Sequence, residues 1–313
     1  MSNDTLRAGY FGKLPAHSDF VRSASHHVLA ELLDQWLAQV MQRLAASARW
    51  RQHYDDLAPL HFAFLGTRSR RVVVGHLRSS SDQSQRRFPF ACMAEVPVAD
   101  GAGLLRCGAH ALAPLWATLA RMAGGAAAAG QPEPLALPDG APDLAAAAQA
   151  LDEFLQCETV LGLSGQLEGV PVRQLMLAVG LLLEGLRKSG APPLRCLALP
   201  LPRDTARQAD VASLWLALVH RMCVRSDLEL GLYLTSLGVS PALVLAFDGA
   251  NPAALHAIID PEVRERWLVD WRNLDWVEQA LAGRPALQRL ALCLEQGQMA
   301  LGSAVQLFHE TFP

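Results

Sequence analysis

The chain has 313 residues, of which 51% are hydrophobic and 18% are charged, and its formal net charge at pH 7 is −3. This composition supports a sizeable core and excludes global disorder, and the near-neutral charge gives no general case for a nucleic-acid partner. The charge is uneven, since residues 1–120 carry a net charge of +4 and residues 121–313 carry −7.

The cysteines and the apolar runs indicate the compartment. The six cysteines are widely separated, which is typical of reduced, buried thiols rather than of a disulfide framework or a zinc site. The N-terminus lacks the apolar core of a signal peptide, and the most apolar run, Leu175–Leu183, is too short to cross a bilayer. We therefore expect a cytoplasmic protein without membrane insertion.

The segment Gly9–Arg22 combines turn-forming residues with large apolar ones. Two glycines, a proline and a Ser-Asp pair interrupt any long regular element, yet Tyr10, Phe11 and Phe20 carry too much apolar surface for a free tail. We expect this segment to be pinned against the core. Its charged side chains are expected to face outward: Lys13, Asp19 and Arg22.

The first half of the chain predicts a helix followed by an antiparallel meander. Apolar residues at helical spacing indicate a helix over 27–44. Three strand-like segments follow, joined by connections too short for parallel pairing: 61–65, 71–77 and 87–96. A segment rich in Ala, Leu and Trp predicts a further helix over 104–123.

The second half opens on a low-complexity segment, residues 124–143, whose Gly, Ala and Pro content predicts a flexible loop. The expected helices after it are 143–157, 171–188, 208–224 and 252–259, and the expected strands are 194–201, 228–235 and 242–247. Residues 261–313 look like a C-terminal helical extension. Its tryptophans lie near helical spacing, which favours core filling over a binding site: Trp267, Trp271 and Trp276.

Two blocks of the sequence resemble the TagF family, also called ImpM, which is associated with type VI secretion. Gly9–Arg22 is similar to the family's opening Gly-aromatic-aromatic-Gly-Lys-Leu-Pro-x-x-Gly-Asp-Phe-Val-Arg, with Ser18 in place of a glycine. Ser79–Phe90 resembles Ser-x-Asp-x-x-Gly-Arg-x-Phe-Pro, with Gln85 in place of a glycine. If the glycine at position 18 serves a positive φ angle, Ser18 must adopt that angle at some cost, or the turn differs locally.

The resemblance covers roughly residues 8–260 and implies an α/β (α+β) fold, with an antiparallel five-stranded sheet flanked by helices as in longin-like or SNARE-like proteins. In that arrangement residues 1–260 form one domain, with a loop or insertion at about 124–170. Residues 261–313 would be a helical extension packed on this domain.

The resemblance also implies a cytoplasmic accessory protein of the bacterial type VI secretion system that has no enzymatic activity, cofactor or metal. It would be a post-translational repressor that binds an FHA-domain scaffold of that system. The residues expected on the partner-binding face are Lys13, Asp19, Phe20, Arg22, Asp82, Arg86 and Phe88, with the two phenylalanines as anchors beneath the charges.

Other interpretations stay open at this stage. The charged residues could instead form a structural network around a turn, where exposed ion pairs contribute only ~0–1 kcal/mol each. The arginines between Arg68 and Arg87 could dock an acidic or phosphorylated surface, or line a solvated hairpin. The chain could also be a structural adaptor without repressor activity. An unrecognised hydrolase would need a polar pocket formed by the fold, because Ser164 lacks the flanking spacing of a nucleophile elbow.

Overall fold

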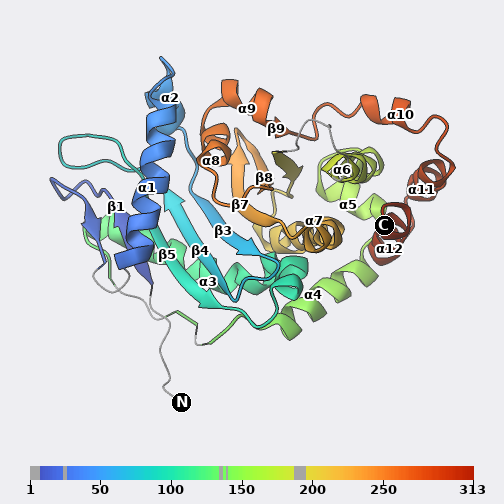
Figure 1. The fold of residues 1–313 in the computed structure, drawn as a ribbon, viewed down its shortest axis with the longest axis horizontal. Coiled ribbons are helices and arrows are strands. Elements are labelled where there is room, and N and C mark those ends of the chain that lie inside the picture. Colours follow the sequence, from blue (N-terminus) through green and yellow to red (C-terminus); the bar gives the residue numbers. More distant parts are fainter. Residues whose placement is uncertain (1–7, 24–26, 134–136, 139, 187–194) are drawn as a thin grey trace.

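Over the residues that the structure, a computed structural model, describes (8–23, 27–133, 137–138, 140–186 and 195–313), the chain forms one nine-stranded sheet with helices on both faces (Figure 1). The strands are β1 (Gly9–Gly12), β2 (Val21–Arg22), β3 (Leu60–Gly66), β4 (Arg71–Arg78), β5 (Phe90–Pro97), β6 (Cys196–Pro200), β7 (Glu229–Leu237), β8 (Ser240–Ala246) and β9 (Leu268–Val269). The helices are α1 (His27–Leu44), α2 (Trp50–Asp55), α3 (Gly101–Ala129), α4 (Leu144–Cys157), α5 (Val160–Gln166), α6 (Val172–Leu186), α7 (Thr205–Ser226), α8 (Pro252–Ile259), α9 (Pro261–Trp267), α10 (Trp276–Ala280), α11 (Pro285–Glu295) and α12 (Leu301–Thr311).

The strand order is β2-β1-β5-β4-β3-β7-β8-β6-β9, and among the described strands every neighbouring pair is antiparallel except β6 with β9. The mixed α/β class is confirmed, but the prediction of a five-stranded, wholly antiparallel sheet is wrong. The strands β1, β2 and β9 have only two to four residues, which is too short for alternation of apolar and polar residues to reveal them. The longin-like description stays a prediction.

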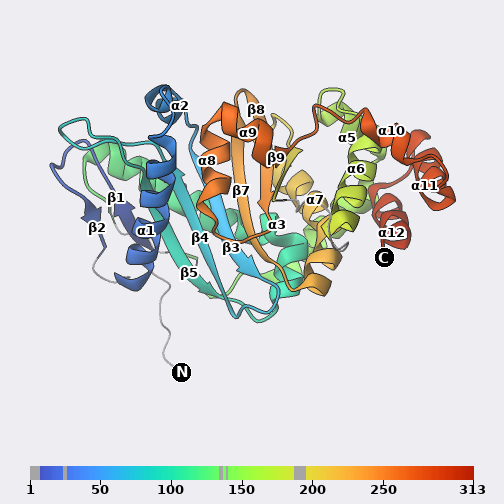
Figure 2. The same cartoon turned by 45° about the horizontal axis from the view of Figure 1, so that its top comes forward.

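The pairing of β3 with β7 joins the two halves of the chain at the middle of the sheet. β3 is hydrogen-bonded to β4 on one side and to β7 on the other, and Phe62 lies opposite Tyr233. The helices α1 and α8 cover one face of the sheet, while α3 and α7 cover the other (Figures 1 and 2). Because strand side chains alternate, Phe62 faces α1 and Ala63 faces the core on the α3 side.

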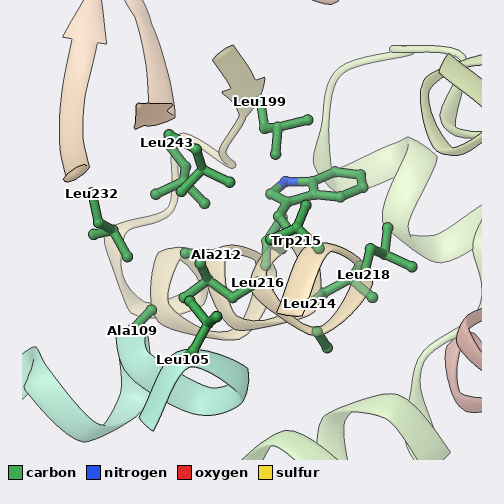
Figure 3. Packing of buried hydrophobic residues seen from close by; sticks show 14 of the residues in the cluster. Leu105, Ala109, Leu199, Ala212, Leu214, Trp215, Leu216, Leu218, Leu232 and Leu243 are labelled. Atoms are coloured by element: carbon green, nitrogen blue, oxygen red, sulfur yellow. The ribbon is translucent and has the colours of Figure 1, made fainter. Parts of the chain in front are cut away.

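The larger core lies between the sheet and the helices α3 and α7. In Figure 3 the fully buried indole of Trp215 lies next to Leu199, and Leu105 and Ala109 of α3 point toward α7. The Trp215 Nε1–H donates to the Pro200 carbonyl oxygen at 2.8 Å, so this buried polar atom has a hydrogen-bond partner. This core therefore fixes α7 against the end of β6.

Several element ends differ from those predicted. The helix α3 does not end at 123 but continues through Gly124 and Gly125 to Ala129, since alanines on either side favour helix. It ends at Gly130, whose φ of 77° is the left-handed angle of a helix C-terminus. Parts of three predicted segments lie outside the described residues: 134–136 and 139 of the loop, 187–188 of a helix, and Leu194 of a strand.

Residues 261–313 are mostly helical, as predicted, but they also contribute to the sheet and the core. β9 pairs parallel with β6, and Leu301 and Phe308 of α12 are buried in the larger core. Among the described helices, none combines the length and the hydropathy that a bilayer crossing requires.

Candidate partner-binding surface

A buried carboxylate, that of Asp82, ties the N-terminal segment to the β4–β5 connection (residues 79–89). Its Oδ1 accepts the backbone N–H groups of Ser84 and Arg86, both at 2.9 Å. Its Oδ2 accepts Nε of Arg86 at 2.7 Å and Nζ of Lys13 at 2.9 Å. Four donors therefore satisfy this carboxylate: three come from the β4–β5 connection, and the fourth comes from Lys13, which directly follows β1.

The charge of Asp82 is held in place by these donors. Burial by itself would raise the pKa of the Asp82 carboxyl, but the hydrogen bonds from Lys13 and Arg86 outweigh it and hold the pKa well below its usual 3.8. The prediction that Lys13 faces outward is wrong, since the residue is only 7% exposed. Its ammonium group lies inside because a buried carboxylate needs a buried counter-charge.

An aromatic cluster lies next to this ion pair. The ring of Phe20 stacks on Phe11, with centroids 5.5 Å apart, and meets the edge of Phe88 at 4.9 Å. The Lys13 ammonium lies 4.9 Å from the centroid of the same ring. Phe88 is buried beneath the charges as predicted, but Phe20 is 42% exposed and so lies at the surface.

Two further predicted residues, Asp19 and Arg22, are exposed, and neither is hydrogen-bonded to Asp82. Asp19 accepts the backbone N–H of Phe20 at 2.8 Å, so it caps its own turn and does not join the donors around Asp82. Arg22 lies on β2 beside α1, where its charge opposes the burial that raises the pKa of Asp34.

Arg86 connects the buried network to the surface. Its Nη2 donates to the Ser18 carbonyl oxygen at 2.7 Å while its Nε holds Asp82, and most of the side chain remains exposed. The residues available to a partner are therefore a subset of those predicted. We call them the loop surface: Asp19, Phe20, Arg22 and Arg86.

The two positions where this sequence lacks a family glycine behave differently. Gln85 has a φ of 61°, and its N–H donates to the Asp82 carbonyl oxygen at 2.9 Å, so the turn requires a left-handed residue there. Ser18 does not have a positive φ, so it meets no such requirement. Gly12 has a φ of 137°, and a Cβ on it would collide with the carbonyl oxygen of Pro89.

A polar pocket of about 470 Å³ lies beside the same turn, and the sequence analysis did not predict it. The hydroxyl of Tyr54 in α2 donates to the Ser80 carbonyl oxygen and accepts the Ser80 N–H, both at 2.8 Å. Asp55 forms a bidentate pair with Arg87, at 2.7 and 2.6 Å. The short helix α2 carries no sequence motif that indicates this role.

The arginine run does not form one basic patch. Arg68 lies in the turn between β3 and β4 and pairs with Asp227, and Arg71 begins β4 and pairs with Glu95. Arg78 lies at the other end of this eight-residue strand, roughly 25 Å away at about 3.3 Å per residue. A single docking surface made of the whole run is therefore wrong, because the strand separates its two ends.

A Ser-His-Asp arrangement is present, between α3 and α7. The His110 ring contacts Ser213 Oγ through Nδ1 at 2.8 Å and Asp210 through Nε2 at 2.9 Å. Ser213 is fully buried, and its Oγ also accepts the His110 N–H at 3.2 Å, just after α3 loses helical geometry at Cys107. This geometry supports a structural role, in which Ser213 satisfies a backbone donor that the kink leaves unpaired.

Side chains that could bind a metal ion are not clustered in the described structure. Within the part of the chain that the structure describes, no three His, Cys, Asp or Glu side chains are placed so that they could hold a metal ion.

One comparison with known proteins, a family model, covers the two sequence blocks. Residues 9–131 match the family model of the TagF N-terminal domain, described as type VI secretion system-associated. No curated protein matches the chain. Among solved structures, the chain is similar to PA0076 from Pseudomonas aeruginosa PAO1, with 16% identity, 81% of this chain and 94% of that chain covered, and a TM-score of 0.44. Both blocks fall inside the matched range, and residues 9–131 therefore carry a TagF N-terminal domain, which is associated with type VI secretion.

Proposed function

We propose that this protein is a cytoplasmic, non-enzymatic accessory protein of the type VI secretion system, and that it represses secretion after translation by binding an FHA-domain scaffold. The observation that carries the proposal is an exposed aromatic ring in a rigid setting. Phe20 keeps 42% of its surface exposed although Phe11, Phe88 and Lys13 hold it from below.

Such a ring suits protein recognition. Aromatic and arginine side chains dominate the binding energy of protein interfaces, and rings that are already fixed lose little conformational freedom on binding. Phe20 is flanked by Asp19 and Arg86, so the loop surface offers one apolar anchor between charges of both signs. The proposed mechanism is sequestration: the scaffold, once bound to this surface, no longer supports assembly of the secretion apparatus.

The binding test uses the purified chain and the FHA-domain scaffold of the same host in isothermal titration calorimetry. We expect Phe20→Asp and Arg86→Glu each to weaken binding at least about tenfold, since both alter the centre of the surface. Val239→Asp is the matched control, because Val239 is 86% exposed in the β7–β8 hairpin and belongs to no part of the loop surface. Unchanged affinity in Phe20→Asp and Arg86→Glu would show that the scaffold binds elsewhere.

The genetic test separates repression from assembly. If the chain is a repressor, deletion of its gene raises secretion, and the Phe20→Asp variant reproduces that rise. A fall in secretion on deletion would contradict repression and would favour the second candidate function, a structural adaptor of the secretion machinery.

The adaptor function is favoured by an apolar groove on the side of α1 that faces the start of α8. This groove, of about 340 Å³, lies between α1, the sheet and the start of α8, with Trp36, Phe64 and Val73 in its lining. Leu32 lines it and is 58% exposed, and Val28 one helical turn earlier is also exposed. A contiguous apolar patch of this kind typically marks an interaction site.

The charges near the groove indicate the chemistry of its partner. Glu229 is hydrogen-bonded through its carbonyl to Gly249, next to the lining residue Ala250, whereas Glu95, the cross-strand neighbour of Val73, is already paired with Arg71. Asp248 adds a further carboxylate on that side. The occupant we propose is an amphipathic helix of another secretion protein, with leucine-like anchors flanked by Lys or Arg.

The test of the adaptor function compares two exposed leucines on helices. Leu32→Arg blocks the groove, whereas Leu292→Arg changes a 64% exposed leucine on α11. Loss of secretion in the first variant and normal secretion in the second supports the adaptor function. Equal secretion in both variants contradicts it.

A further inference from the structure

We propose that the pocket beside the β4–β5 connection binds a phosphoryl group. We call it the turn pocket. Its volume of about 470 Å³ is in the range of small-ligand sites, and it is open to solvent next to the loop surface. Apolar contacts come from Pro15, Tyr54 and Ala127, while the polar lining comes from the β4–β5 connection and the end of β4.

The first argument is an uncompensated guanidinium. Arg78 ends β4 and is partly buried, and its side chain forms no hydrogen bond or ion pair with any residue that the structure describes. Arg87 also lines the pocket, but its Nε and Nη2 are used by Asp55. Asp55 is the one carboxylate in the described lining, so Arg87 neutralises it and the pocket keeps the positive charge of Arg78.

The second argument is a surplus of donors around that charge. Ser79 and Ser81 line the pocket, and their hydroxyls make no side-chain hydrogen bond within the described residues, whereas the Ser80 hydroxyl donates to the Lys13 carbonyl oxygen. A planar carboxylate is satisfied by one guanidinium, as Asp55 is by Arg87. Donors from an arginine and two hydroxyls on separate residues suit the three oxygens of a phosphoryl group better.

The third argument concerns Gln85, which lines the turn pocket and has a φ of 61°. A glycine at this position would keep the turn but would supply no side chain. Gln85 adds an amide donor to the pocket wall, so this chain offers one more donor than a relative with glycine there.

The test uses the full-length chain and three probes in isothermal titration calorimetry at low ionic strength, where screening is weak. The probes are inorganic phosphate, a short uncharged peptide that carries phosphothreonine, and the same peptide with glutamate at that position. We expect the phosphothreonine peptide to bind and inorganic phosphate to compete with it. Binding of inorganic phosphate alone also supports the proposal and identifies a free anion, rather than a phosphorylated side chain, as the occupant.

Matched arginine variants assign the binding to the turn pocket. Arg78→Ala should weaken phosphate binding about tenfold or more, since a charge-assisted bidentate contact is lost. Arg78→Lys should retain part of the affinity, and its melting temperature shows whether loss in the alanine variant comes from misfolding. Arg70→Ala is the control, because Arg70 directly precedes β4, at the end opposite Arg78, and its side chain also has no partner within the described residues.

Three results would overturn the proposal. One is the absence of heat with both phosphorylated probes, and another is an equal loss of affinity in Arg70→Ala and Arg78→Ala, which would indicate only a diffuse positive field. The third is equally tight binding of the glutamate peptide, which would identify a carboxylate site. None of these results depends on the scaffold, so the turn pocket can fail while the loop surface stands.

Discussion

The Lys13 ammonium nitrogen lies 2.9 Å from Asp82 Oδ2, and both side chains are buried although 69 residues separate them in the sequence. This contact fixes the segment that carries Phe20 to the connection that carries Arg86. The position of the exposed residues Phe20 and Arg86 therefore depends on the buried pair Lys13 and Asp82. Mutations of the exposed residues and of the buried pair can test the two contributions separately.

Removing one partner of the buried pair should destabilise the fold. Asp82→Asn places an amide N–H group against donors from Lys13 and Arg86, and Lys13→Met leaves the carboxylate with fewer counter-charges. We expect melting temperatures lower by roughly 5–10 °C for Asp82→Asn, and by less for Lys13→Met because Arg86 remains. Circular dichroism melts check this, with Arg68→Met as a control that breaks only an exposed pair. A melt of Asp82→Asn that coincides with wild type would show that the pair adds no stability.

The two replaced glycines should respond in opposite directions to reversion. Gln85→Gly removes the backbone strain of a non-glycine residue with a left-handed φ, which is ~1–2 kcal/mol. The greater entropy of glycine in the unfolded state costs ~0.5–1 kcal/mol, which is less than this gain. We expect a net gain of about 0.5–1 kcal/mol in the free energy of unfolding. Ser18→Gly relieves nothing and should lose about 0.5–1 kcal/mol. Urea unfolding measures both, and a stabilising Ser18→Gly would contradict the backbone description of that turn.

Two neighbouring histidines should make stability depend on pH. Burial lowers the pKa of His61 to about 4 and that of His76 to about 3, and their Nδ1 atoms lie 3.2 Å apart on β3 and β4. An unfolded histidine takes up a proton near pH 6.5, whereas the folded one does not until far lower pH. Stability is therefore intact above pH 6.5 and falls as the pH drops toward 4, by on the order of 1 kcal/mol per pH unit for each histidine.

Urea unfolding at pH 7, 6 and 5 checks this slope. His76→Leu removes one histidine of this pair, so its slope between pH 7 and 5 should be smaller than that of the wild type. An identical slope in the variant would mean that other groups cause the pH dependence.

Truncation after residue 260 should prevent folding. It removes β9 from the edge of β6 and takes Val277, Leu301 and Phe308 out of the core. Each buried side chain of this size contributes roughly 1.5–3 kcal/mol, so their joint loss exceeds the stability of an ordinary domain once neighbouring residues are counted. We expect insoluble protein on expression. A soluble 1–260 fragment with a cooperative melt would show that the C-terminal residues form a separate unit.

Elements with strong periodicity could be predicted from the sequence. The bounds of α1 and α8 agree with the predicted 27–44 and 252–259, since an apolar stripe or a proline after a capping Asn251 defines them locally. β9 could not be predicted, because two residues carry no period and their pairing with β6 depends on the rest of the fold. Gly124 also misled the prediction, because alanine neighbours outweigh its low helix propensity.

The partner-binding role of the predicted residues stays a prediction, and their exposure could not be predicted from the sequence. A motif indicates that Lys13 and Asp82 matter together, and it does not tell whether water reaches them. The access of water to the Lys13 ammonium group depends on Phe20, whose ring lies over that group. The turn pocket escaped prediction because Tyr54 and Arg78 meet only through tertiary structure.

The pairing of β3 with β7 has a consequence for the range that matches the TagF N-terminal domain. Residues 9–131 contain β3 but not its neighbour β7, so a fragment with those limits would expose a seven-residue strand with a free row of backbone donors and acceptors. Such a strand tends to pair with another copy of itself. We therefore expect that residues 9–131, although they match one domain in sequence, are not stable as a separate fragment.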